Sequence, residues 1–213
     1  PQNPKTPYIL KHMVLIIYYN SISFIILIFI QSNQLTANNK TPSQWVEDIS
    51  NQTLIILGDD LISSDKKVQY LENIFIENLD IKRISLFILG PYRKNLKSSE
   101  SSQYFNAIKS FISKVYAKRL SSYPSGNIKI TKVEEKGRRG IVVSSLVTFN
   151  DRPNPISIDW WILKSSVSDY KVFDIRISGI WMAQEQRSTF TSFLSKNNGD
   201  VINLIKKIEL QIN

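Results

Sequence analysis

The chain has 213 residues, enough for one domain with its own core, and its formal net charge is +9. It contains no cysteine, and its single histidine, His12, lies beside an N-terminal apolar run. If that run is removed, the mature protein has neither residue type, which excludes Ser-His-Asp and Cys-His catalysis and the usual zinc and copper sites.

The N-terminal segment has the parts of a secretory signal. Lys5 and Lys11 supply positive charge, residues 14–30 are largely apolar, and a polar stretch ending at Ala37 offers a cleavage point. We therefore expect residues 1–37 to be a signal peptide. The alternative is an uncleaved N-terminal anchor, although the apolar run is shorter than the about 20 residues that a spanning helix needs.

Residues 38–213 are expected to form one domain whose first half is helical. Each predicted helix rests on a start signal, a stop signal or a regular apolar spacing. The predicted helices are 41–58, 64–79, 80–90 and 99–121. The last of these has apolar side chains at intervals of three and four residues over more than four turns, which makes it strongly amphipathic.

After Gly126 the apolar period changes to two, which predicts strands. Four strands are expected between Gly126 and Ile180, and because short turns join them, they should form an antiparallel meander. Helices are expected again after Gly179 and from Gly199 to Leu210. The fold class is therefore α+β, with the 99–121 helix packed across the apolar face of the sheet.

The segment 169–190 carries the most specific pattern in the chain. It has aromatic-Lys-Val-aromatic-Asp on a strand, then Gly-Ile, then Arg-x-x-Phe on a helix, and its key residues are Asp174, Gly179, Arg187 and Phe190. This pattern resembles the C-terminal signature of the MlaC-type phospholipid-binding proteins, also called toluene-tolerance auxiliary components. The resemblance covers roughly residues 43–210, with Trp181 and Gln186 as departures from the usual pattern.

The resemblance implies a carrier and not an enzyme. Proteins of this type are soluble phospholipid carriers in the periplasm of Gram-negative bacteria, and they maintain the lipid asymmetry of the outer membrane. The implied cargo is glycerophospholipid, with no cofactor. The implied partners are an inner-membrane ABC-type lipid transporter with its membrane-anchored ring component, and an outer-membrane lipoprotein complex. Nucleic acid is not expected, because the basic residues are scattered.

The apolar face of the sheet and the apolar stripe of the 99–121 helix can either close into a packed core or enclose a hydrophobic cavity. The resemblance favours a cavity for acyl chains, where each buried CH₂ contributes about 0.8 kcal/mol. We expect no ionisable side chain deep in it. The predicted lipid-binding residues are Phe111, Val115, Val143, Val147, Ile158, Trp160, Phe173 and Ile175.

The polar residues of the signature have two interpretations. Asp174 and Arg187 can form a pair that pins the helix to the sheet, or they can contact a lipid headgroup. Two rival functions stay open: a cone-shaped α+β enzyme acting on a small hydrophobic substrate, which needs an acid inside the apolar pocket, and a membrane-anchored interaction protein with a solid core. The positive charge is consistent with attraction to anionic membranes, or with a bias in composition.

Overall fold

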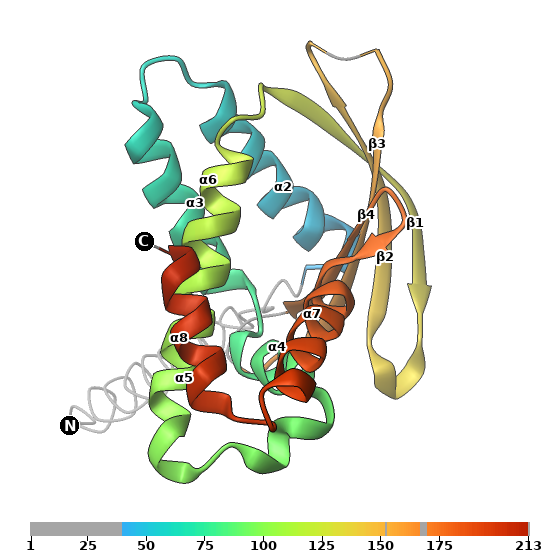
Figure 1. Ribbon diagram of the computed structural model, residues 1–213. Coiled ribbons are helices and arrows are strands. Elements are labelled where there is room, and N and C mark those ends of the chain that lie inside the picture. The colour runs from blue at the N-terminus through green and yellow to red at the C-terminus, as the bar shows by residue number, and fades with distance from the viewer. Residues whose placement is uncertain (1–39, 152, 167–169, 213) are drawn as a thin grey trace, which may run out of the picture. The chain divides into compact units, whose positions relative to one another are not determined.

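The computed structural model describes residues 40–151, 153–166 and 170–212, which form an α+β unit (Figure 1). The predicted signal peptide, residues 1–37, lies outside the described residues. Within the described ranges, no helix combines the length and apolar character needed to cross a membrane.

The first helices begin and end close to where their sequence signals place them. Thr41 caps α2 in a capping box, because its side chain accepts a hydrogen bond from the backbone N–H of Gln44, whose side chain in turn accepts one from the Thr41 N–H. The carboxylate of Asp80 accepts a hydrogen bond from the backbone N–H of Arg83 and caps α4, without a capping box. The elements are α2 (Pro42–Gly58), α3 (Ser64–Asn78), α4 (Ile81–Ile88) and a 3₁₀ turn (Gly90–Asn95).

The predicted 99–121 helix is a continuous helical rod with an irregular centre. It consists of α5 (Ser98–Ser110), a π-helical turn (Phe111–Val115) and α6 (Tyr116–Leu120). A π turn adds one residue to a helical turn and so rotates the apolar stripe of the following helix. Apolar spacing predicted the extent of the rod but not this rotation.

The sheet is antiparallel throughout, in the order β1-β2-β3-β4-β5. Its strands are β1 (Gly126–Glu135), β2 (Ile141–Phe149), β3 (Ile156–Lys164), β4 (Tyr170–Ile177) and β5 (Ile180–Trp181). The four-strand meander is confirmed, and the short β5 extends it. Ser178 and Gly179 form the β4–β5 turn, both with positive φ (48° and 90°), as a two-residue type I′ hairpin turn requires. Outside the named strands, one isolated parallel bridge joins Leu79 to Val172.

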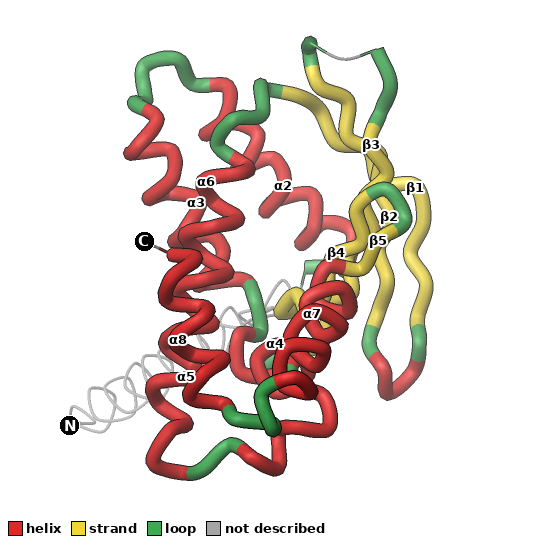
Figure 2. The backbone as a smooth tube through the Cα atoms, viewed as in Figure 1, coloured by secondary structure: helices red, strands yellow, loops and turns green. Residues whose placement is uncertain are grey.

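Helix α2 lies across the sheet, with α3 and α6 on its other side (Figures 1 and 2). The prediction that the 99–121 helix crosses the apolar face is therefore wrong; that helix packs mainly against α3, α4 and α8. α4 and α7 (Met182–Lys196) pack against β4, and α8 (Val201–Ile212) packs along α5. The amphipathic stripe indicated burial correctly, but it did not indicate the partner.

The interior consists of three clusters of buried apolar residues. The helical cluster lies among α4, α5, α7 and α8, and includes Ile88, Ile108 and Phe190. The Trp45 cluster joins the first half of α2 to β2, β3 and β4. The Leu54 cluster joins the second half of α2 to α3, α6 and the sheet. Ile49 of α2 is partly buried and packs against both of the last two clusters.

Candidate functional site

The side of the sheet that faces α2 is apolar across all four long strands. Cross-strand partners share a face, so the register assigns each row of residues to one side. One row joins Val133, Val143, Trp160 and Ile175. The next joins Ile130, Ser145, Ile158 and Ile177.

Five of the eight predicted lipid-binding residues lie on this α2-facing side. Val143, Trp160 and Ile175 belong to or pack against the Trp45 cluster, and Val147 and Ile158 belong to or pack against the Leu54 cluster. Val143 and Val147 are 0% and 4% exposed, whereas Ile158, Trp160 and Ile175 are only partly buried. The structure therefore brings these five residues onto one face but divides them between two clusters.

The other three predicted residues lie elsewhere. Phe111 is buried in the helical cluster, and Val115 packs against it; the π turn that contains both residues packs against α3 and α8. Phe173 also packs against the helical cluster, not against α2. Its predicted place on the same face as Ile175 is wrong.

A β-bulge is the reason for the placement of Phe173. Trp161 pairs with Asp174 and Ile162 pairs with Val172, so Phe173 has no partner on β3. A bulge adds one residue and shifts the alternation of faces along the strand. Val172 and Ile175 consequently face α2, while Phe173 turns to the opposite side.

One hydrogen-bonded polar pair lies within the apolar face, and the sequence did not indicate it. The hydroxyl of Ser145, which is buried, donates to the carbonyl oxygen of Ile158 at 3.0 Å. It also accepts from the indole N–H of Trp160 at 3.1 Å. Both polar groups are thus satisfied, and the pair fixes the orientation of the Trp160 ring.

On the opposite side of β3 and β4, aromatic rings form a row that reaches α4, which we call the aromatic ladder. Its members are Trp181, Trp161, Phe173 and Phe87, and the successive ring centroids are 5.7, 5.4 and 5.2 Å apart. The guanidinium of Arg176 lies 5.2 Å from the Trp181 ring at one end. That of Arg187 lies 4.9 Å from the Phe87 ring at the other. Edge-to-face rings and cation–π contacts of this kind fasten β4 to α4 and α7.

Asp174 caps α7 from the neighbouring strand. One carboxylate oxygen accepts hydrogen bonds from the backbone N–H groups of Ala183, at 2.7 Å, and Ile175, at 2.8 Å. The other oxygen is buried and has no hydrogen-bond partner within the described ranges, so the predicted pair with Arg187 does not form. Burial raises the pKa of Asp174, and the backbone hydrogen bonds oppose this rise.

The position of Asp174 bears on the rival enzyme hypothesis. A catalytic acid of that kind would have to lie inside the apolar pocket, beside Trp160. Asp174 pairs with Trp161 and so lies on the opposite side of the sheet, as does Asp159. The only carboxylates among the buried residues that the structure describes are these two, and neither faces α2.

The remaining residues of the signature have structural positions. Phe190 is fully buried in the helical cluster. Arg187 lies against Gly90, where a Cβ would come within 3.1 Å of the guanidinium Nε and 2.9 Å of Thr191 Cγ2. Gly90 has a φ of +57°, so both its backbone conformation and this close approach require glycine.

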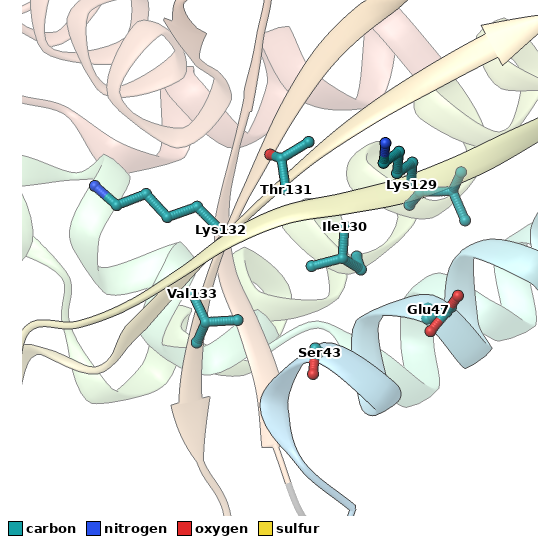
Figure 3. A pocket seen from close by; sticks show the side chains of 8 residues that line it. Ser43, Glu47, Lys129, Ile130, Thr131, Lys132 and Val133 are labelled. Atoms are coloured by element: carbon teal, nitrogen blue, oxygen red, sulfur yellow. The ribbon is translucent and has the colours of Figure 1, made fainter.

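Hollows lined by described residues lie between β1 and α2 and between α5 and α8. The larger, of about 560 Å³, lies between β1 and the first turns of α2 (Figure 3). It is lined by Ser43, Glu47, Ile128, Lys129, Ile130, Thr131, Lys132 and Val133. The smaller, of about 390 Å³, lies between α5 and α8 and is mostly polar. None of the eight predicted lipid-binding residues lines either hollow, so their role in lipid binding stays a prediction.

Metal-binding groups are not evident in this part of the protein. No group of three or more His, Cys, Asp or Glu side chains that could hold a metal ion occurs among the described residues. The side chains on the α2-facing side are mostly apolar, and Ser145, Trp160 and Tyr170 contribute polar atoms among them.

Comparison with known proteins assigns the family. The fold is similar to that of a phospholipid-binding protein from Ralstonia solanacearum, whose structure was solved in complex with a phospholipid. The TM-score is 0.65 and the sequence identity 20%, and the match covers 78% of this chain and 96% of the other. A sequence model of the MlaC protein family matches residues 47–209, which is most of the chain. The chain therefore belongs to the MlaC protein family.

Proposed function

We propose that this protein is a periplasmic carrier that shuttles glycerophospholipid between membrane complexes of the inner and outer membranes. The observation that carries the proposal is family membership over residues 47–209, together with a fold shared with a protein that was crystallised with phospholipid. The N-terminal segment, with its basic and apolar parts, supports export through a signal sequence.

The geometry is suited to holding acyl chains without chemistry. The α2-facing side presents apolar side chains on all four long strands, and its polar pair, Ser145 and Trp160, is internally satisfied. An acyl chain placed there loses its contact with water, which stabilises the complex by about 0.8 kcal/mol for each CH₂. Ile49 of α2 packs against both clusters on this face and is itself only partly buried.

The proposed cycle consists of binding, shielding and release. The protein extracts a phospholipid at one membrane complex, covers its acyl chains between α2 and the sheet, and gives it up at another. An inner-membrane ABC-type transporter with its ring component and an outer-membrane lipoprotein complex are the proposed partners, by analogy within the family. The proposal assigns the protein no catalytic residue and no cofactor.

The test is to express the full chain in a host with phospholipid membranes, purify it without detergent, and record native mass spectra before and after lipid extraction. We expect a stoichiometric mass increment that extraction removes and that contains phosphate. A folded protein without bound phospholipid, which also takes none from vesicles, would contradict the carrier. A small apolar metabolite in its place would favour the enzyme, and an empty, closely packed protein would favour the solid-core interaction protein.

A further inference from the structure

We propose that the tip of the β4–β5 hairpin is a membrane-contact site, which binds the surface of an anionic phospholipid bilayer. The inference rests on the proposed carrier function, to which it adds the place where the protein meets a membrane. The hairpin consists of the end of β4, the turn at Ser178 and Gly179, and β5, and α7 follows it directly (Figure 2).

Two isoleucines at the hairpin tip are exposed to solvent. The exposed fraction is 39% for Ile177 and 54% for Ile180, and the two are direct partners across β4 and β5, so their side chains share a face. No other two exposed large apolar side chains in the described ranges are cross-strand partners. Single exposed apolar side chains are common, but a contiguous exposed pair is a patch.

The exposed pair continues into the apolar face of the sheet. Ile177 is the partner of Ile158 on β3, which is partly buried and is one of the predicted lipid-binding residues. We call Ile158, Ile177 and Ile180 the hairpin patch. It therefore lies at the edge of the α2-facing side, where the proposed acyl site is.

A short turn supports the hairpin patch. The backbone N–H of Ser178 donates a hydrogen bond to the carbonyl oxygen of Ser157 at 3.1 Å, which fastens the turn to the start of β3. A Cβ added to Gly179 would meet no atom within 4 Å, so the tip borders open space. The two isoleucines are thus presented on a tight, anchored turn and not on a long loop.

The other face of the hairpin carries an arginine and a tryptophan. Arg176 and Trp181 are cross-strand partners, and the Arg176 guanidinium stacks on the Trp181 ring. Asp159 binds the Nε and Nη2 of Arg176 and offsets its charge, but no hydrogen bond from its Nη1 is found within the described ranges. Nη1 can therefore donate to a phosphate oxygen, and tryptophan is enriched where membranes meet water.

A lipid surface fits this hairpin better than a folded partner. A stable protein interface buries about 800 Å² on each partner, and two partly exposed isoleucines on a two-residue turn offer only a small part of that area. At the boundary between headgroups and acyl chains the isoleucines would leave water. Trp181 and Arg176, on the opposite face, would then lie among the headgroups.

The overall charge favours an anionic surface. The formal net charge of the chain is +9, and Lys5 and Lys11 of the predicted signal peptide supply only two of these charges. Anionic phospholipid attracts such a protein within the screening distance of salt, about 8 Å at 0.15 M. The exposed acidic residue nearest to the hairpin in sequence is Glu185, in the first turn of α7, and it opposes this attraction locally.

The first experiment measures vesicle binding by flotation at low salt, with vesicles of phosphatidylglycerol and phosphatidylcholine. Ile177→Thr combined with Ile180→Thr should weaken binding about tenfold, as the loss of two half-exposed apolar side chains implies, while threonine suits a strand. The matched control combines Leu61→Thr and Leu210→Thr, which are 97% and 81% exposed and lie outside the sheet. The control should bind like the unmodified protein, although it removes more exposed apolar surface.

The outcomes separate this inference from the proposed function. Phospholipid that co-purifies with the unmodified protein tests the carrier and does not depend on flotation. If the unmodified protein does not float, floats equally with pure phosphatidylcholine, or loses no more binding in the hairpin variant than in the control, the membrane-contact site is overturned while the carrier stands. A dimer that the hairpin variant lacks would make the patch an interface between copies and also overturn it.

A second experiment locates the contact. Because the chain has no cysteine, a single fluorophore can be attached at Ser178→Cys, on the tip, or at Leu210→Cys on α8. Phosphatidylglycerol vesicles that contain a nitroxide-labelled lipid should quench the label at position 178 strongly and the label at position 210 little. Removal of the vesicles should restore the fluorescence. Equal quenching at both positions would overturn the location, and quenching that persists would show that the label senses bound cargo and not a membrane.

Discussion

The carboxylate of Asp174 accepts a hydrogen bond from the backbone N–H of Ala183 at 2.7 Å, and so a strand residue caps the helix that follows it. α7 begins after Trp181, whose side chain makes no capping hydrogen bond. The first N–H groups of a helix have no partner within it, and without Asp174 the N–H of Ala183 would be buried and unsatisfied. The Asp of the family signature is thus explained by helix capping.

Replacement of Asp174 should reveal this cap and its pH dependence. Asp174→Ala should lower the free energy of unfolding by about 1–2 kcal/mol, the typical cost of a lost cap. Asp174→Asn keeps an acceptor and should cost less. Because burial raises the folded-state pKa, the contribution of Asp174 is largest below the unfolded pKa of about 3.9 and declines as pH rises through the folded value.

The measurement is urea unfolding of the unmodified protein and Asp174→Asn across the acid range. The difference in free energy of unfolding between them should favour the unmodified protein most at the lowest pH and shrink as pH rises. A difference that is constant, or that grows with pH, would contradict the conclusion that burial raises the pKa of the Asp174 carboxyl.

In the Arg176–Asp159 pair, replacing the arginine by alanine should cost more stability than replacing the aspartate. Both the Nε and the Nη2 of Arg176 lie 2.6 Å from one oxygen of Asp159. The Asp159 side chain is 6% exposed and that of Arg176 is 42% exposed. Arg176→Ala leaves a buried carboxylate unpaired and should cost about 2–3 kcal/mol, whereas Asp159→Ala frees an arginine that can reach water and should cost about 1 kcal/mol.

Denaturant unfolding of both variants and of the double variant measures the asymmetry. The double variant should be more stable than Arg176→Ala alone, because it removes the unpaired carboxylate as well. Equal costs for the two single variants would show that Asp159 finds another partner.

Local sequence signals predicted the extent of most elements. Thr41 with Pro42 and Gly58 placed the limits of α2, and the change of period at Gly126 placed the start of the meander, because caps and alternation are properties of neighbouring residues. Alternation could not predict the bulge at Phe173, since the extra residue is defined only by its partner strand.

Tertiary contacts account for what the sequence left undetermined in the candidate site. The apolar stripe of the 99–121 helix showed that it would be buried, but its partners are mainly the helices α3, α4 and α8 and not the sheet. The predicted lipid residues therefore belong to three clusters instead of one. The hydrogen bond between Ser145 and Trp160 is also non-local, because it joins residues on two strands.

Two adjacent residues on β2 test which side of the sheet is buried. Val147 is 4% exposed in the Leu54 cluster, whereas Leu146 points to the opposite side and is 37% exposed. Val147→Glu places an unpaired charge in an apolar cluster and should cost several kcal/mol, enough to unfold a domain of ordinary stability, about 5–15 kcal/mol. Leu146→Glu should change stability by less than about 1 kcal/mol. Thermal melts followed by circular dichroism measure the stability of both variants. Similar melting temperatures for the two would contradict the register.

The last prediction separates residues that contact lipid from residues that only stabilise the fold. Ile158 is partly buried on the α2-facing side, so the charged end of Ile158→Glu can reach water past its neighbours. The variant should stay folded and lose phospholipid, because a carboxylate then lies where acyl chains would pack. Phe173→Ala, on the opposite side, should lose about 2–3 kcal/mol with the removal of its ring from the aromatic ladder.

Phe173→Ala should nevertheless keep its phospholipid, because the bulge turns this residue away from α2. Both variants are purified from the same host, and each sample is divided between a thermal melt and a phosphate assay of the extracted lipid. A stable Ile158→Glu protein with a full complement of phospholipid would remove the α2-facing side as the acyl site. If instead Phe173→Ala loses its lipid while keeping most of its stability, acyl chains lie in the helical cluster, beside Phe111 and Val115.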